Sequence, residues 1–231
     1  QYETWKESKH ATALSDLKAN SYARDYCAAC HSADVRLGMA QTLAEAETSI
    51  TCSVCHDPHP EDPDQAGFAL LRTDEYTLCT QCHNGHLTGA TFEPGATIHH
   101  PQQEMFEGLG AIEVAGQPSF HYVYGVTCVD CHLGEIQPEG LRHGGSSHYF
   151  TPITPEVAAA AGYARDACTA CHEGSLPDIR QAYIDFWQEQ VGAQLTAVEE
   201  LLTRAKAYLD GASPELRALY DRAYTNFSLV Q

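Results

Sequence analysis

The clearest hydrophobic pattern lies in the last quarter of the chain. Beyond Leu176, apolar residues recur mostly at steps of three or four, the period of a helix with one apolar face. That face carries Ile179, Tyr183, Phe186, Val191, Leu195, Val198, Leu201 and Leu202. We expect the helix to stop at Asp210-Gly211, because glycine is favoured just past a helix end. Ser213 and Pro214 then supply an N-cap and a first-turn proline, so the pattern predicts a pair of C-terminal helices.

The preceding part of the chain is patterned differently. Gly and Pro interrupt it often, as in residues 57–60 (Asp-Pro-His-Pro) and 93–95 (Glu-Pro-Gly), which favours turns over long elements. Its longest apolar stretch, residues 157–164, is far too short to cross a bilayer. We therefore expect an all-α fold in which residues 1–176 form short helices and loops. Residues 177–231 are expected to form the helical pair packed on that domain.

Ten cysteines supply the candidate chemistry, and all of them belong to Cys-x-x-Cys-His segments. The gaps between successive segments are 20, 22, 44 and 35 residues, too uneven for a solenoid repeat. The five segments are Cys27, Cys30 and His31; Cys52, Cys55 and His56; Cys79, Cys82 and His83; Cys128, Cys131 and His132; and Cys168, Cys171 and His172.

This spacing has a physical reason. Two thiols three residues apart can add to the two vinyl groups of one haem, and the imidazole that follows reaches the iron. The sequence thus predicts five covalently bound haem c groups, each with one proximal histidine. Each porphyrin is a large apolar plate that substitutes for side-chain core, so we expect the apoprotein to be largely unfolded.

Zinc sites and disulfides are the alternative interpretations of so many cysteines. A zinc ribbon needs no histidine directly after every second cysteine. Ten cysteines would also form two four-cysteine sites with one pair left over, whereas haem attachment accounts for all five pairs and their histidines. Haem is therefore favoured.

Eight further histidines are available as sixth ligands, whereas the chain has only two methionines. A second imidazole saturates the iron and lowers its reduction potential relative to a histidine–methionine pair, so low-potential, low-spin haems are expected. His59 lies three residues after His56, close enough to serve a neighbouring haem. The eight are His10, His59, His86, His99, His100, His121, His143 and His148.

The net charge and the first residues of the chain provide information about binding partners and cellular location. The formal net charge of −18 argues against nucleic acid and anionic membranes and suggests partners with basic docking patches. The chain begins at Gln1 without a basic and apolar leader. We interpret it as a mature, exported chain, periplasmic or extracellular, without a membrane span, whose redox partners are other cytochromes.

The motifs resemble those of the superfamily that includes pentahaem cytochrome c nitrite reductase and hydroxylamine oxidoreductase. The most specific part is His121, then residues 125–132 (Gly-Val-Thr-Cys-Val-Asp-Cys-His), then His148, the last motif and a long helix. Residues 5–11 (Trp-Lys-Glu-Ser-Lys-His-Ala) resemble the leading ligand segment of the group. The resemblance implies that His10, His121 and His148 are distal ligands. It also implies that relatives extend beyond the last residue here, so we expect a C-terminal segment to be lacking.

Departures from the nitrite reductases weigh on the function. The first motif ends in His31 where most of those enzymes have a catalytic lysine, and no lysine lies between Lys18 and Lys206. Asn84-Gly85-His86 follows the third motif, where the enzyme would carry a tyrosine.

Residues 100–104 (His-Pro-Gln-Gln-Glu) resemble the stretch that supplies an active-site histidine in the reductases. We expect His100 to have become the sixth ligand of the first haem, with His99 and then His86 as rivals. His143 is expected to face solvent.

The leading prediction is an electron carrier with closely packed haems. Similar multihaem proteins also form extracellular filaments, so a homopolymer is a form that the resemblance implies. The alternative is a reductase of nitrite, hydroxylamine or another small oxyanion at an open haem. In that alternative the groups around the iron would be Arg72, Arg142, Tyr122, Tyr124 and His100.

Overall fold

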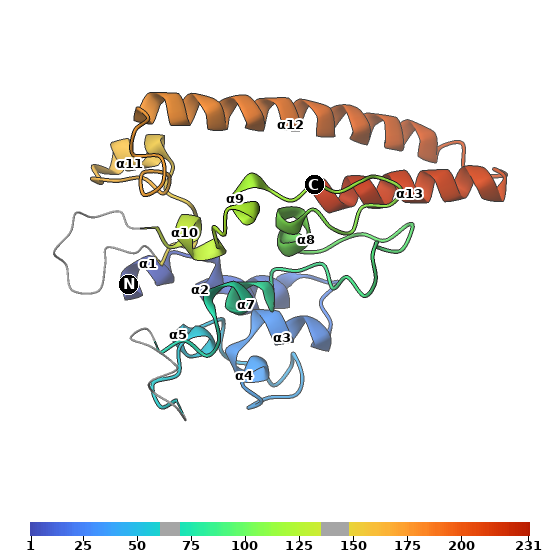
Figure 1. The fold of residues 1–231 in the computed structure, drawn as a ribbon. Helices are drawn as coiled ribbons and strands as arrows, with labels where there is room; N and C mark the ends of the chain where they lie inside the picture. The colour runs from blue at the N-terminus through green and yellow to red at the C-terminus, as the bar shows by residue number, and fades with distance from the viewer. Residues whose placement is uncertain (61–69, 135–147) are drawn as a thin grey trace. The chain divides into compact units, whose positions relative to one another are not determined.

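The computed structural model describes residues 1–60, 70–134 and 148–231, and over these ranges the chain is helical. The described β pairing consists of two isolated bridges, His56 with Leu71 and Thr91 with Gly110, so the all-α prediction is confirmed. The helices (Figure 1) are α1 Tyr2–Lys6, α2 Lys9–Ala19, the 3-10 turn Asp25–Cys27, α3 Ala28–His31, α4 Ala33–Arg36, α5 Cys52–Cys55, α7 Glu75–Thr80, α8 Gln102–Glu107, α9 Phe120–Val123, α10 Cys128–His132, α11 Pro155–Ala161, α12 Pro177–Lys206 and α13 Pro214–Val230.

The chain forms two compact units. Unit 1 comprises Gln1–Gln81 with Thr127–Arg180, and unit 2 comprises Cys82–Val126 with Gln181–Gln231. The predicted division into a haem-binding segment 1–176 and a helical pair 177–231 concerns haem binding and stays a prediction.

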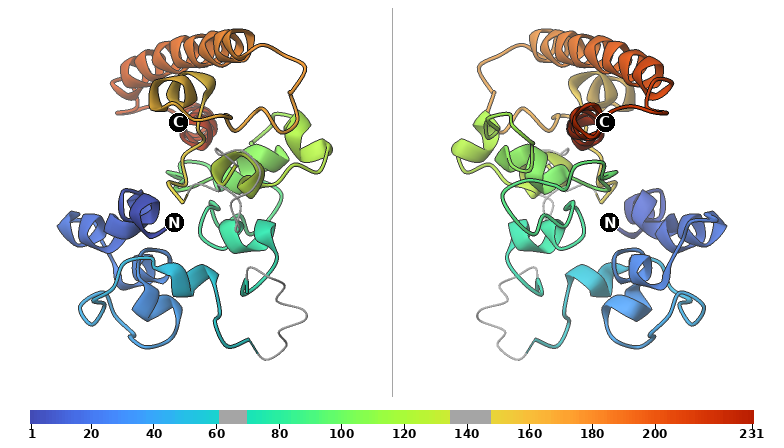
Figure 2. Two further views of the ribbon diagram at one scale, coloured as in Figure 1. Left: turned by 90° about the vertical axis from the view of Figure 1, so that its left-hand side faces the viewer. Right: turned by 90° about the vertical axis from the view of Figure 1, so that its right-hand side faces the viewer.

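Short helices linked by side-chain hydrogen bonds form unit 1. The Trp5 indole N–H donates to the Ile50 carbonyl at 3.0 Å, and the Leu14 N–H donates to the Ser49 hydroxyl at 3.2 Å. The His148 N–H donates to the Thr4 hydroxyl at 3.2 Å, which joins the two chain segments of the unit. Figure 2 shows the N-terminal helices of this unit, coloured blue to cyan, gathered together.

In unit 2, helix α13 is fixed to the segment 92–112. Thr225 is fully buried, and its hydroxyl accepts from the Gly95 N–H at 2.8 Å. The Asn226 side chain accepts from the Ile112 N–H at 2.8 Å and donates to the carbonyl of the same residue at 3.0 Å. The Ser228 hydroxyl accepts from the Ile98 N–H at 2.7 Å. Side chains of α13 thus satisfy backbone N–H and C=O groups of an irregular segment, as buried backbone groups require.

The two predicted C-terminal helices are present. Helix α12 begins at Pro177 as expected but ends at Lys206, four residues before Asp210, because 3-10-type bonds such as Tyr208 N–H to the Ala205 carbonyl tighten its last turn. Ser213 accepts from the Leu216 N–H at 3.3 Å and Pro214 opens α13, so the predicted cap is confirmed. Figure 1 shows α13 turning back after the connection.

The apolar face of α12 is largely exposed. Of the residues of α12, Leu202 alone is buried, whereas Ile179, Tyr183 and Phe186 each expose half of their surface or more. The amphipathic pattern thus predicted the helix, but the described chain does not cover its apolar face. No helix among the described residues combines the length and hydropathy that a membrane crossing requires.

Candidate haem sites

Each Cys-x-x-Cys-His motif forms a helical turn. Four motifs lie in or at the ends of α3, α5, α7 and α10, and the fifth forms a turn in which the His172 N–H donates to the Cys168 carbonyl at 2.9 Å. In the second motif the His56 N–H donates to the Cys52 carbonyl at 2.8 Å. A helical turn places residues three apart on the same face, so both thiols of a motif point to the same side. This is the arrangement that double attachment to one haem edge requires.

Acidic side chains cap the turns of the third and fourth motifs. The Asp130 carboxylate accepts from the Thr127 N–H at 2.6 Å and from the Thr127 hydroxyl at 2.9 Å. Asp74 accepts from the Thr77 N–H at 2.9 Å at the start of α7, and hydrogen bonds from Thr77 lower the pKa of Asp74. Caps of this kind stabilise turns too short to persist alone.

A buried ion pair fixes the fifth motif. Arg180 and Asp166 approach to 2.5 Å with side-chain exposures of 9% and 5%. Asp166 also accepts from the Cys168 N–H at 2.9 Å, and Arg180 donates to the His172 carbonyl at 3.2 Å. Burial alone would raise the pKa of Asp166, but hydrogen bonds from Arg180, Thr169 and the Cys168 N–H hold it below its usual value. The pair therefore connects both ends of the motif to the first turn of α12.

Cysteines of successive motifs are neighbours in unit 1. The Cys79 thiol is hydrogen-bonded to the Cys128 sulfur, which lowers the pKa of Cys128 to about 7. Burial raises the pKa of Cys131, and the charge of Asp130, followed by that of Cys171, adds to the increase. As thioethers these sulfurs would no longer titrate, but the contact of Cys79 with Cys128 shows that the third motif adjoins the fourth.

Two predicted ligands face each other at the second motif. The rings of His56 and His148 have centroids 6.4 Å apart and planes inclined by 31°. Two imidazoles on opposite sides of one metal ion, each bonded at about 2 Å, have centroids about 6 Å apart. An iron between the two rings would be held by His56 and His148, and their ligand roles stay predictions.

The fourth motif has a different partner. His132 Nδ1 lies 2.8 Å from the Phe150 carbonyl oxygen, and the Phe150 ring lies edge-on to His10 with centroids 4.3 Å apart. A carbonyl can only accept, so Nδ1 of His132 carries the proton and Nε2 has the lone pair that a metal requires. Sequence reasoning did not identify Phe150, and no sequence signal marks it.

Unit 2 brings together three of the histidines discussed above. The His83 and His100 rings have centroids 5.8 Å apart, and those of His99 and His100 are 3.8 Å apart. His99 and His100, which the sequence offers as alternative ligands of one haem, thus also lie close together in space. The pairing of His100 with the first haem joins residues of two units and stays a prediction.

The remaining histidines occupy separate positions. His59 lies in an exposed turn where its N–H donates to Asp57 at 3.0 Å, and His121 lies in α9. His86 has a left-handed backbone, φ 58°. His143 lies outside the described residues. The ligand roles of His59 and His121 stay predictions.

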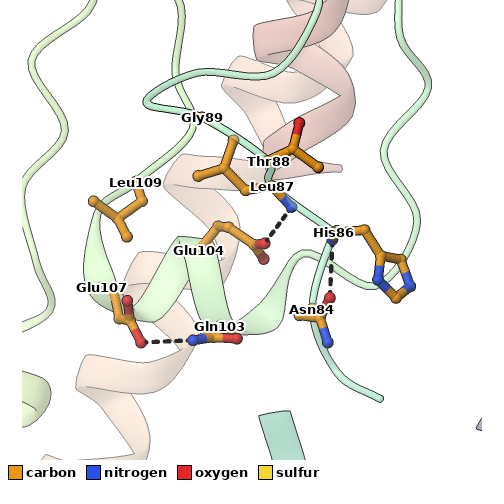
Figure 3. Close-up of a pocket in the computed structure, with 9 residues that line it drawn as sticks. All are labelled: Asn84, His86, Leu87, Thr88, Gly89, Gln103, Glu104, Glu107 and Leu109. Atoms are coloured by element: carbon orange, nitrogen blue, oxygen red, sulfur yellow. Dashed lines mark hydrogen bonds between the residues drawn. The ribbon is translucent and has the colours of Figure 1, made fainter. Parts of the chain in front are cut away.

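A cavity of about 520 Å³ follows the third motif (Figure 3). One wall is the loop that carries Asn84 and His86, and the other is α8 with Gln103 and Glu107. The buried Glu104 joins the walls by accepting from the Gly85 N–H at 2.8 Å and the Leu87 N–H at 3.4 Å.

The surface of the chain also fits haem. Large apolar side chains beside motifs and predicted ligands are exposed, including Tyr26 at 80% and Phe120 at 81%. Thiols, imidazoles and exposed apolar side chains together suit covalent haem.

Comparisons with known proteins agree with this assignment. Residues 86–218 match the family model for cytochrome c552, and residues 44–87 match a model for a doubled CXXCH motif. A search of curated proteins gave no match.

Two solved structures are similar to the chain. The outer cell wall cytochrome OcwA has 34% sequence identity and a TM-score of 0.78, and the match covers 99% of this chain and 46% of that one. An undecahaem cytochrome from the S-layer of Carboxydothermus ferrireducens has 23% identity and a TM-score of 0.62, with coverage of 94% and 37%. The second likeness concerns the fold alone. The chain spans less than half the length of either protein.

Proposed function

The chain belongs to the cytochrome c552 family, and from that premise we propose that it is an electron-transfer protein with five covalently attached haem c groups. The observation that carries the proposal is the contact between the third and fourth motifs, at the neighbouring sulfurs of Cys79 and Cys128. Haems attached at adjoining sulfurs have adjoining edges. Such a pair offers an electron a route from one haem to the next.

The proposed axial ligands favour an electron carrier over an enzyme in which one iron has a free coordination position. The spacing of His56 and His148 suits an iron bound on both sides, and such an iron exchanges electrons without binding substrate. We assign His31, His56, His83, His132 and His172 as proximal ligands. The distal ligands proposed with them are His10, His59, His100, His121 and His148.

The related structures suggest where the protein acts. OcwA is an outer cell wall cytochrome and the second relative comes from an S-layer, so we propose that this chain is exported and acts at or beyond the cell surface. Its net charge of −18 suits redox partners with basic docking patches, and we propose that these partners are other cytochromes. Assembly of copies into a filament is a further form of the same proposal.

Electron paramagnetic resonance of the oxidised protein, together with its intact mass, tests the proposal. Five haem additions and only low-spin signals are expected. A high-spin signal equivalent to one haem per chain would contradict full saturation, and a mass with fewer haems would contradict the stoichiometry.

The second candidate function is reduction of nitrite, hydroxylamine or a related small oxyanion. Similarity to the nitrite reductases and the cavity beside the third motif favour it, because His86 and Glu107 could move protons there. Turnover of either substrate by the reduced protein, lost in His86→Ala and kept in an exposed control such as Thr196→Ala, would establish it.

A further inference from the structure

Phe150 lies among three histidines of unit 1. Its carbonyl oxygen is 2.8 Å from His132 Nδ1, and its ring is edge-on to His10 at 4.3 Å and to His148 at 5.6 Å between centroids. We propose that Phe150 is a positioning residue that sets the tautomer and the donor strength of His132 toward the fourth iron. This inference rests on the proposed axial role of His132.

The hydrogen bond fixes the chemistry of the imidazole. Because the Phe150 carbonyl accepts the Nδ1 proton of His132, Nε2 is the metal-binding nitrogen and the ring cannot rotate freely about χ2. Withdrawal of that proton toward the carbonyl makes the ring a stronger electron donor. A stronger donor favours the ferric iron, so Phe150 lowers the reduction potential of the fourth haem.

The backbone of Phe150 is unusual in a way that supports this role. Its φ is 58°, a left-handed conformation that bulky residues rarely adopt. Neighbouring contacts hold it there: the His148 N–H donates to the Thr4 hydroxyl at 3.2 Å, and Tyr149 packs on the buried Ile153 and Ala158. Such strain persists only where the surroundings impose it, and it often accompanies a functional geometry.

One turn therefore serves two haem sites. His148 faces His56 at the second motif, and Phe150, two residues later, holds His132 of the fourth motif. A change in the turn at 148–150 reaches both irons through the backbone. The segment couples the axial geometry of two haems that belong to different motifs.

Two variants distinguish the effect of the Phe150 carbonyl from the effect of the Phe150 ring. Phe150→Asn removes the ring but keeps a residue that tolerates left-handed backbone, so the carbonyl stays in place. Phe150→Val also removes the ring, but its β-branch disfavours that conformation and displaces the carbonyl. In Phe150→Val we expect the ferric-to-ferrous equilibrium of the fourth haem to shift toward ferrous by about tenfold, which is 59 mV for one electron. Phe150→Asn should leave the fourth haem near its wild-type potential.

Haem methyl resonances followed by nuclear magnetic resonance through a reductive titration report each haem separately. Equal shifts of the fourth haem in both variants, or no shift in Phe150→Val, would overturn the proposal. Should the valine variant fail to mature, Phe150→Asn still decides, because loss of the ring with the carbonyl in place must leave the potential of the fourth haem unchanged, and a shift in that variant would overturn the proposal. A chain that carries no fourth haem by intact mass would instead contradict the proposed function.

Discussion

In unit 2, side chains of α13 satisfy the backbone of an irregular segment, whereas unit 1 carries four complete Cys-x-x-Cys-His motifs on short helical turns. In unit 2, buried Thr225 and the side chains of Asn226 and Ser228 satisfy the backbone of the segment 92–112, and Phe92 and Phe227 are buried. In unit 1 the motif helices are four to six residues long and depend on caps and clamps. Isolated helices of that length do not persist in water. We therefore expect haem to contribute most to the fold of unit 1, beside the core that its own side chains form, such as Leu14 and Ala158.

Removal of haem should have the largest effect, and that effect should differ between the two units. In protein produced without haem attachment, we expect the motif turns of unit 1 to lose their amide protection, including the His56 and His172 N–H groups. The amides of Gly95, Ile98 and Ile112 in unit 2 should stay protected because α13 supplies their acceptors. Hydrogen exchange of the apoprotein and the holoprotein measures both. Protected motif turns in the apoprotein would show that haem is not the core of unit 1.

Loss of the buried Asp166–Arg180 ion pair at the fifth motif should give the next largest effect. Arg180→Met leaves Asp166 buried without its partner, and loss of one member of a buried pair costs about 3–5 kcal/mol. The matched control is Arg72→Met, which breaks the pair with Asp57 at 3.0 Å, whose side chains are 34% and 30% exposed, and should cost about 0–1 kcal/mol. Urea denaturation of the holoprotein compares the two variants, and equal losses would contradict the role of the Asp166–Arg180 pair.

A smaller effect is expected in unit 2. Thr225→Val keeps the shape of the side chain but removes the hydroxyl that accepts from the Gly95 N–H and donates to the Glu93 carbonyl. Because the Gly95 N–H keeps the Asp221 carbonyl at 3.1 Å as an acceptor, the free energy of unfolding should fall by about 0.5–1.5 kcal/mol. Thr196→Val on exposed α12 is the control and should change it by no more than about 0.5 kcal/mol. If both variants unfold alike in urea, the hydroxyl of Thr225 is not what holds α13.

The smallest effect is a dependence of stability on pH. Because the pKa of Asp166 is lower in the folded chain than its ordinary value of 3.8, the ionised form stabilises the fold at every pH above that value. The contribution is lost as pH falls through the folded pKa. Thermal denaturation between pH 6 and pH 3 should therefore show a steeper acid loss in the wild type than in Asp166→Asn. Identical acid profiles would indicate that another carboxylate dominates.

The positions that sequence reasoning identified and those it missed differ in kind. The motif cysteines, Ser213 and the period of α12 carry local signals, because thiol spacing, capping and helical periodicity act over a few residues. The Asp166–Arg180 pair is 14 residues apart and carries no such signal, although an acidic residue just before a motif and a basic one just after it is a hint that could have been followed. Phe150 contributes through its backbone carbonyl, which every residue has, so no side-chain pattern could reveal it.

By itself, the sequence determined the chemistry: five pairs of thiols each followed by an imidazole, a surplus of histidines and two helices at the C-terminal end. Covalent attachment and helical periodicity are local, and local spacing suffices to specify them. Only the tertiary structure decided which groups meet, since His56 and His148 are separated by more than 90 residues and Gly95 and Thr225 by 130. Such contacts depend on how loops close and side chains pack, and neither is set by the neighbours along the chain.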